Sequence, residues 1–473
     1  MQQSLKKRTI NGLIWSALQR FGALAISFIA NLIIARILDA TIFGTIGVLL
    51  VFVAISQSIV DSGFTAALIQ RKDVTQVDYS TVFFWNLFVS GILVIVLYFS
   101  APYIADYYND AILCTVLRVQ SVLLIVHALC VVQTAKLTKE LAFKVLSIRN
   151  LVATFIGAIV AIVMAYYGYG IWSIVAQELV VGIVGTILLW AYCDWKPSFI
   201  FSWKSFKGMF KFGSLIFLSG MVETIYNNIQ SLIIGRAFSM KELGYYTQAK
   251  KLESIPITTG SSVLSQVLFP AYSSIADDYN RIKRVVRKNI SIVSFVAFPF
   301  MFFLTIYAEP IITILYTDKW AESIPMFQVL CIGGAFHPLN VANTMLFKSI
   351  GRGDIFFILQ VVKRVLCIIL ILFSIRYGLY AMMWTMTITM VLFYSINIYF
   401  SHKYFGYTIK EQLSDIMGGI LMAIFASVVV VYISHFSDFT NNVVNIAVGV
   451  LAYMVLYGIV LFILRKYNKI KLK

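Results

Sequence analysis

Six basic residues lie inside long apolar stretches of this 473-residue chain, where an ionised side chain is costly. A charge at the middle of a membrane span costs roughly 2.5–3.5 kcal/mol on insertion scales, so such residues need a structural or functional reason. Arginine binds phosphate through paired hydrogen bonds and lysine adds a point charge, so a cavity lined by them suits an anionic substrate. The six predicted substrate-binding residues are Arg20, Arg118, Lys250, Lys251, Lys363 and Arg364.

Acidic and amide side chains accompany these basic residues in the same apolar stretches. Asp61, Glu178 and Glu223 are candidates for ion coupling, because a carboxylate withdrawn from water can bind a proton or Na⁺. A further carboxylate, Glu253, follows the lysine pair. Polar residues that recur at helical spacing are expected to face the interior of the bundle or a wet cavity. Those predicted to line the cavity are Ser27, Asn31, Asn227 and Gln230.

Each of these residues also has a structural interpretation. Serine and threonine stripes pack helices together, and lysines near the end of a span extend their head groups to the interface. Asp61 or Glu223 could pair with a structural arginine, and His127 and His337 could be packed or hydrogen-bonded. Arg20 and Arg364 lie two to three turns from either end of their spans, so they are the strongest candidates for a substrate cavity.

Motifs for catalysis do not accompany these residues. The sequence has no Walker A loop, no HExxH metal motif and no GxSxG elbow. Its five cysteines form neither a CxxC pair nor a cluster with histidine, so no disulfide framework or metal site is predicted. We therefore expect no enzyme activity and no cofactor. An H⁺ or Na⁺ gradient, the membrane potential or the substrate gradient would drive transport.

The elements that position these residues must be membrane helices. Hydrophobic residues make up 60% of the chain and charged residues 12%, against roughly 45–50% and about 25% in soluble domains. This composition excludes a soluble enzyme, a disordered scaffold and a disulfide-built secreted module. The apolar runs are about twice as long as the ~10-residue strands of an outer-membrane barrel, so the predicted class is all-α. Fourteen spans are expected, near 10–35, 42–66, 81–103, 112–134, 150–167, 170–191, 212–235, 244–270, 289–308, 322–347, 355–375, 379–400, 412–433 and 443–464.

The net charge of +17 predicts the orientation of these spans. In a soluble protein such a charge would suggest nucleic acid, but here most basic residues fall in short loops. With the N-terminus in the cytoplasm, 27 of the 38 Lys and Arg residues lie on the cytoplasmic side and five on the outer side. Cytoplasmic loops of membrane proteins are enriched in Lys and Arg. Both termini are therefore predicted to be cytoplasmic, and no nucleic-acid partner is expected.

A weak internal repeat divides the chain. The run Leu32–Arg36 is echoed by Leu232–Arg236, and a glycine follows each arginine after eight residues, at Gly44 and Gly244. Six helices per repeat place both copies in the same orientation, related by a pseudo-two-fold axis along the membrane normal. We therefore expect two six-helix lobes with a cleft between them. The predicted domains are 1–200, 201–402 and a C-terminal segment 403–473 with helices 13 and 14.

Several short motifs carry a resemblance to a known family. They are Ile34–Asp39 with Phe43-Gly44, Asp61-Ser62-Gly63-Phe64, Ile69–Lys72, Gly244-Tyr245-Tyr246, Val267–Tyr272, and Asp318-Lys319-Trp320 with Pro325. In this set and order the chain resembles the polysaccharide-transport (Wzx, WzxC-like) flippases of the multidrug/oligosaccharidyl-lipid/polysaccharide superfamily. The resemblance covers nearly the whole chain.

The resemblance implies a function and a location. Such proteins move an undecaprenyl-pyrophosphate-linked oligosaccharide across the bacterial cytoplasmic (inner) membrane by alternating access, for O-antigen, capsule or exopolysaccharide export. The implied partners are this lipid-linked substrate, the membrane lipids and the polysaccharide polymerase machinery. Two alternatives within the superfamily stay open. One is a cation-coupled multidrug antiporter, which would need an acidic, aromatic cavity. The other is a flippase for the peptidoglycan lipid precursor, which shares the anionic head group.

Overall fold

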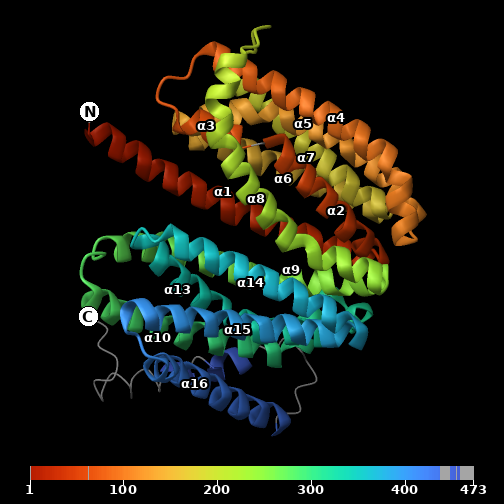
Figure 1. Ribbon diagram of the computed structural model, residues 1–473. Coiled ribbons are helices and arrows are strands. Elements are labelled where there is room, and N and C mark those ends of the chain that lie inside the picture. The colour runs from red at the N-terminus through yellow and green to blue at the C-terminus, as the bar shows by residue number, and fades with distance from the viewer. Residues whose placement is uncertain (1, 62, 437–447, 454, 459–473) are drawn as a thin grey trace. The chain divides into compact units, whose positions relative to one another are not determined.

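The computed structural model consists of long helices (Figure 1). It describes residues 2–61, 63–436, 448–453 and 455–458, and these contain no β-strand. The elements run in the order α1 Gln2–Ile37, α2 Ala40–Asp61, α3 Phe64–Gln70, α4 Gln76–Tyr108, α5 Ala111–Lys139, α6 Phe143–Tyr166, α7 Ile171–Tyr192, α8 Trp203–Ala237, α9 Met240–Ser273, α10 Tyr279–Ile306, α11 Ala308–Tyr316, the 3₁₀ turn η1 Asp318–Trp320, α12 Ser323–Gly334, α13 His337–Ser349, α14 Gly353–Ser374, the 3₁₀ turn η2 Ile375–Tyr377, α15 Leu379–Phe405 and α16 Ile409–Phe436.

Twelve stretches within the described residues are long and apolar enough to cross a membrane, so the chain is a multi-pass, all-α membrane protein. The expected count of fourteen is not confirmed. The predicted span 244–270 is the helix α9, which is long enough but too polar to qualify by composition. Most of the predicted span 443–464 lies outside the described residues. The predicted span 322–347 is a pair of consecutive helices, α12 and α13.

The chain forms two compact units, Met1–Gly244 and Tyr245–Lys473. In the first unit, α4 packs along α5, α6 lies between α1 and α7, and α8 packs against α2, α3 and α4. In the second unit, α10 packs along α16, and α15 contacts α12, α13 and α14. The predicted lobe boundary near residue 200 stays a prediction.

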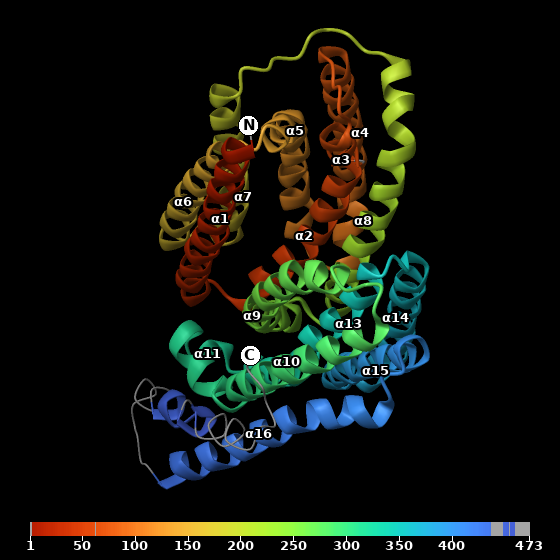
Figure 2. The same ribbon diagram turned by 90° about the vertical axis from the view of Figure 1, so that its left-hand side faces the viewer.

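The segment 193–202 connects α7 to α8 and crosses one end of the first unit (Figure 2). The first turns of α4 hold it in place, since Trp195 Nε1 donates to Gln76 Oε1 at 2.6 Å and the Ser198 amide donates to Ser80 Oγ at 3.0 Å. An aromatic core that includes Phe83 and Phe206 lies beneath it. The start of α8 is thereby fixed to the first unit.

A glycine interrupts the second predicted span. We expected one helix over 42–66, but α2 ends at Asp61 and α3 begins at Phe64. Gly63 has φ 69°, in the left-handed region that side chains with a Cβ rarely adopt, and a Cβ there would overlap the carbonyl oxygen of Gly213 in α8. The break therefore lets the backbone between α2 and α3 touch the backbone of α8.

The repeated glycines Gly44 and Gly244 make one reciprocal contact inside the first unit. A Cβ on Gly44 would overlap the carbonyl oxygen of Met240, and a Cβ on Gly244 would overlap the carbonyl oxygen of Ala40. Since these four positions repeat at a spacing of 200, each half of the sequence supplies a glycine and a carbonyl. Two helix starts can approach this closely only without side chains between them.

Candidate functional site

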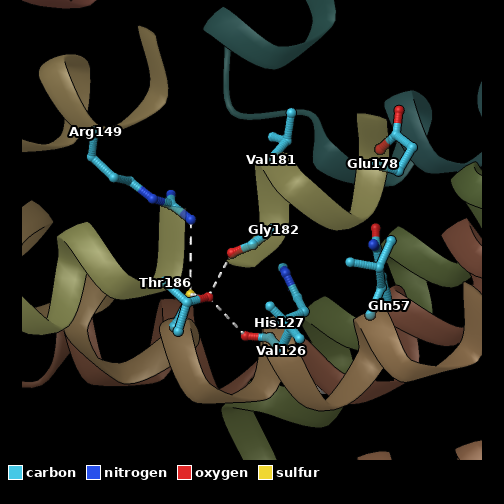
Figure 3. A pocket seen from close by; sticks show the side chains of 10 residues that line it. Gln57, Val126, His127, Arg149, Glu178, Val181, Gly182 and Thr186 are labelled. Atoms are coloured by element: carbon cyan, nitrogen blue, oxygen red, sulfur yellow. Dashed lines mark hydrogen bonds between the residues drawn. The ribbon is translucent and has the colours of Figure 1, made fainter. Parts of the chain in front are cut away.

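A polar pocket of about 180 Å³ lies inside the first unit, between α2, α5, α6 and α7. In Figure 3, Arg149 lies on one side of it, Gln57 and Glu178 on the other, and His127 between them. Three of the helices contribute ionisable side chains, and the apolar lining is Leu123, Val126, Val181 and Gly182. A pocket with this mixture of charges on membrane helices is a candidate binding site rather than a packing defect.

Close packing of α7 against its neighbours holds Arg149 at the pocket wall. Its Nε donates to the carbonyl oxygen of Gly185 at 3.0 Å, and a Cβ on Gly185 would press against the guanidinium. A second guanidinium nitrogen, Nη2, lies 3.8 Å from the sulfur of Cys130, which itself is 2.8 Å from Thr186 Oγ1. The positive charge of Arg149 is thus fixed by neutral partners on α7 and α5.

His127 and Asp61 face each other across α5 and α2. The distance from His127 Nε2 to Asp61 Oδ1 is 3.7 Å, beyond hydrogen-bonding range. The His127 Nε2 atom is buried and has no hydrogen-bond partner among the described residues. Thr65 Oγ1 of α3 donates weakly to the same carboxylate oxygen, at 3.4 Å. Asp61, the last residue of α2, therefore connects α5 to the break before α3.

The other predicted residues of the first unit lie elsewhere. Arg118 packs on the ring of Tyr98, with its guanidinium carbon 4.4 Å from the ring centroid, and donates to the Tyr98 carbonyl at 3.2 Å. Asn31 is buried, and its Oδ1 has no hydrogen-bond partner among the described residues. Ser27 and Gln230 are half-buried, whereas Arg20, Glu223 and Asn227 are exposed. None of these residues lines the pocket described above.

In the second unit, Lys363 is held by a chain of neutral amides. The side chain is 5% exposed, its Nζ donates to Asn397 Oδ1 at 2.6 Å, and Asn397 Nδ2 donates to Asn340 Oδ1 at 2.8 Å. The Nζ also lies 5.8 Å from the ring centroid of Phe393. Among the described residues, the Lys363 amine is thus bonded to a neutral amide and not to a carboxylate.

The remaining predicted residues of this unit differ in their ion pairing and in their exposure. Lys250 Nζ forms an ion pair with Glu253 Oε2 at 2.9 Å, and the Glu253 side chain is 3% exposed. Lys251 is exposed and Arg364 half-buried. The Lys250–Glu253 pair has no net charge, so Lys250 adds less positive charge to a cavity than the sequence alone suggests.

Two groups of ionisable residues in the helices were not predicted from the sequence. Arg149 falls just before the predicted span 150–167, but it lies in α6, which begins at Phe143. Arg287 falls just before the predicted span 289–308, but it lies in α10. It forms ion pairs with Glu411 at 2.9 Å and with Asp415 at 2.8 Å, both in α16. Basic residues at the first turns of a membrane helix look like loop residues in a hydropathy profile, so no signal in a single sequence separates them.

Metal binding has no support in the described part of the chain, where no three His, Cys, Asp or Glu side chains converge. The pocket lining instead brings together one imidazole, one carboxylate and one fixed guanidinium.

Comparison with known proteins identifies the kind of chain to which this architecture belongs. A family described as polysaccharide biosynthesis protein matches residues 33–325. The teichuronic acid biosynthesis protein TuaB of Bacillus subtilis is 25% identical over 466 residues, which cover 96% of each chain. The lipopolysaccharide biosynthesis protein WzxC of Escherichia coli is 24% identical over 367 residues, which cover 77% of this chain and 75% of WzxC.

The fold is also similar to that of a solved transporter. The lipid II flippase MurJ, in an inward closed conformation, superposes with a TM-score of 0.74 over 96% of this chain and 100% of MurJ, at 17% sequence identity. At this identity the similarity establishes the shared helical architecture.

Proposed function

The chain belongs to the polysaccharide biosynthesis protein family, and from that premise we propose that it is a flippase for a lipid-linked oligosaccharide. Its substrate would be an oligosaccharide repeat unit joined to undecaprenyl pyrophosphate, moved from the inner to the outer leaflet of the bacterial cytoplasmic membrane by alternating access. Relatives named for teichuronic acid and for lipopolysaccharide support a polysaccharide precursor as the cargo. The chain is therefore a transporter and not an enzyme.

The observation that carries this proposal is the presence of basic side chains inside the spans. Lys363 is buried against a neutral amide and a ring, and Arg364 follows it in the middle of the span Gly353–Tyr377. Keeping a charge at such a depth is costly unless it has a counter-charge, and an anionic substrate would supply one. We propose that Arg20, Arg118, Lys251, Lys363 and Arg364 attract the pyrophosphate, with Lys250 contributing less because of Glu253.

The two alternatives differ from this proposal in charge or in cargo. A multidrug antiporter takes up organic cations, and a positive interior would repel them. A flippase for the peptidoglycan precursor would share both the fold of MurJ and the anionic head group. The family match and the named relatives favour polysaccharide export over the peptidoglycan pathway.

Several finer features belong to the same proposal. Both termini would face the cytoplasm, as the distribution of Lys and Arg favours. An ion gradient would drive transport through Asp61, Glu178 or Glu223, while Ser27, Asn31, Asn227 and Gln230 would contact the sugars or water. The polysaccharide polymerase machinery would receive the substrate on the outer face.

Complementation tests the function. The chain is expressed in a bacterium that lacks its own O-antigen flippase, and surface polysaccharide is measured together with the abundance of the protein in the membrane. We expect surface polysaccharide to be restored. A second strain, depleted of its peptidoglycan-precursor flippase, should not be rescued. Rescue of that strain alone would overturn the proposal in favour of the peptidoglycan alternative.

A further inference from the structure

The pocket between α2, α5, α6 and α7 has a buried floor and an accessible mouth. The floor consists of Leu123, Cys130 and Thr186. At the mouth, Glu178 is exposed, and Gln57 and Arg149 are half-buried. A ligand from outside the first unit can therefore reach these polar groups without unfolding a helix.

The size of the pocket restricts what it can hold. Its volume of about 180 Å³ is several times the ~30 Å³ that one water molecule occupies in the liquid. It is smaller than the ~300–1,000 Å³ of pockets for drug-sized ligands. The space therefore suits one small ring, such as a single sugar residue, and not a chain of sugars.

Arg149 is held in place with hydrogen-bond donors to spare. A guanidinium has five N–H donors. The bond from Nε to the Gly185 carbonyl oxygen, at 3.0 Å, uses one, and the 3.8 Å contact of Nη2 with the Cys130 sulfur uses a second. Among the described residues these two atoms are the acceptors for Arg149. Three N–H donors therefore remain for a ligand, on a guanidinium that is already positioned.

The opposite side of the pocket can accept hydrogen bonds. Gln57 and Glu178 lie across the pocket from Arg149 (Figure 3). A carboxylate only accepts, and a primary amide both accepts and donates. A matching ligand must therefore accept bonds on one side and donate them on the other. Hydroxyl groups do both, so a ring that carries several hydroxyls satisfies both sides.

The charges of the pocket favour a ligand without net charge. A free anion that binds Arg149 would face the carboxylate of Glu178, and a free cation that binds Glu178 would face the guanidinium. The side chains of Leu123, Val126 and Val181 give the rest of the lining an apolar surface, which suits the C–H groups of a sugar ring. Size, hydrogen bonding and charge therefore agree on a neutral sugar.

We propose that this pocket is a subsite for one neutral sugar residue of the lipid-linked oligosaccharide. The inference rests on the proposed function as a flippase. None of the six basic residues predicted to attract the pyrophosphate lines the pocket, so the sugar and the head group are recognised by different residues. Arg149 and Gln57 donate to the sugar hydroxyls, and Glu178 accepts from them. Transport thus depends on the sugar of the cargo as well as on its anionic head group.

A binding measurement tests the site without any lipid. Saturation-transfer NMR on the purified full-length protein compares the neutral methyl glycosides of glucose, galactose and N-acetylglucosamine with two charged probes, methyl glucuronide and glycine. We expect at least one neutral glycoside to bind. Gln57→Leu and Glu178→Ala should each weaken its binding about tenfold, because each removes a hydrogen-bonding partner.

A control variant and the charged probes make this measurement decisive. Glu309→Ala, at an exposed position in the first turn of α11 and outside the pocket, should bind the glycoside as the wild type does. The inference is wrong if no neutral glycoside binds, if only a charged probe binds, or if both pocket variants bind as well as the wild type.

A transport measurement separates this inference from the proposed function. Flipping in vesicles is compared for undecaprenyl pyrophosphate that carries the bound sugar and for undecaprenyl pyrophosphate without sugar. The wild type should flip the sugar-bearing lipid several-fold faster, and in Gln57→Leu the ratio of the two rates should fall towards one. A merely structural defect would lower both rates and leave their ratio unchanged, and Glu309→Ala should keep the ratio of the wild type.

The outcomes of the transport measurement distinguish the two claims. Equal rates for the two lipids in an active wild type, or an unchanged ratio in Gln57→Leu, would overturn the sugar subsite and leave the flippase function standing. If the folded wild type flips neither lipid but binds the glycoside in the pocket, the proposed function is wrong and the sugar site itself stands.

Discussion

Single charged side chains set the chemistry of this membrane domain. Asp61 lies 3.7 Å from His127 across two helices, and Lys250 pairs with Glu253 one turn away. Lys363 donates to the Asn397 amide and lies near the ring of Phe393. A balanced pair can be structural, whereas a buried charge without a counter-charge destabilises the protein until a ligand neutralises it. Lys363, which is held by an amide, is thus expected to matter more for an anionic cargo than Lys250, which pairs with Glu253.

Arg20 and Arg364 give the residue-scale test of the cationic cavity. Replacing either with alanine should weaken binding of the pyrophosphate about tenfold or more, because a charge-assisted bond contributes at least ~1.4 kcal/mol, which is tenfold in affinity. Lysine keeps the charge but loses the planar fork, so Arg→Lys should be intermediate. The measurement is complementation of a flippase-deficient strain with membrane abundance recorded. Full activity of Arg20→Ala and Arg364→Ala at normal abundance would contradict the cationic-cavity mechanism, and a loss of abundance alone would make the arginines structural.

The residue types of the site were predictable, but their partners were not. Charges inside apolar runs are visible in the sequence, and so are the two histidines His127 and His337. The contact of His127 with Asp61 joins α5 to α2 across 66 positions, and a spacing within one helix cannot reveal it. Arg149 was missed because it lies in the first two turns of α6, where hydropathy is still low.

At the scale of elements, α16 is fastened to α10 by a network of charges. Arg287 bridges Asp415 and Glu411, Lys283 Nζ pairs with Glu411 at 2.8 Å, and Tyr407 donates to Asp415 at 2.8 Å. Further along, Gly419 lies against the backbone of α10. These contacts attach a helix that lies outside the two-lobe repeat of the sequence to the second unit.

The variant Arg287→Ala should therefore destabilise the second unit. It leaves Asp415 and Glu411 without their shared partner in a half-buried site, which costs about 1–3 kcal/mol. Thermal unfolding of the purified full-length protein measures the effect. The matched control is Arg352→Ala, which removes an exposed ion pair with Asp354 and should leave the unfolding temperature unchanged. Equal unfolding temperatures for both variants would show that the network is not structural.

The glycine crossing of α2 and α9 allows a second test at this scale. Gly44→Ala should lower membrane abundance or transport, because its Cβ would overlap the carbonyl oxygen of Met240 and the two helices must separate. Gly220→Ala in α8 is the control, since a Cβ there meets no atom within 4 Å. Normal abundance and full complementation by Gly44→Ala would mean that the close approach is not required.

The helices themselves were largely predictable, and their interruptions were not. Apolar runs of about 20 residues predict membrane helices because an unpaired backbone is too costly in lipid. The breaks between α2 and α3, at Gly63, and between α12 and α13, near Ala335, depend on tertiary contacts that hydropathy does not record. The helix α9 is 34 residues long, but it carries Lys250, Lys251 and Glu253. It is therefore too polar to count as a membrane span by composition.

At the scale of the whole molecule, the distribution of basic residues predicts the topology. Reporter fusions after residues 75, 205, 285 and 470 should all report a cytoplasmic location, and fusions near 107 and 318 an external one, because basic loops stay in the cytoplasm. A cytoplasmic reading near residue 318 would overturn the order of the spans in the second unit.

The family of the whole chain agrees with its fold. The resemblance that the motifs suggested is confirmed by the match over residues 33–325 and by relatives that cover most of the chain. A lipid-linked anion must pass from one leaflet to the other for a polysaccharide to be exported. The positive charge within the spans would lower the barrier for its head group.

Flipping of a labelled lipid in vesicles is the most direct test of this account. Vesicles with and without the purified full-length protein contain an undecaprenyl-pyrophosphate-linked oligosaccharide with a fluorophore on its sugar, and membrane-impermeant dithionite is added outside. Without the protein, only the outer leaflet is exposed and about half of the fluorescence should be lost. With the wild type nearly all of it should be lost, and with the double variant Arg20→Ala, Arg364→Ala the loss should return towards half. The central claim would be contradicted if vesicles with folded, inserted wild type lost no more fluorescence than the protein-free vesicles.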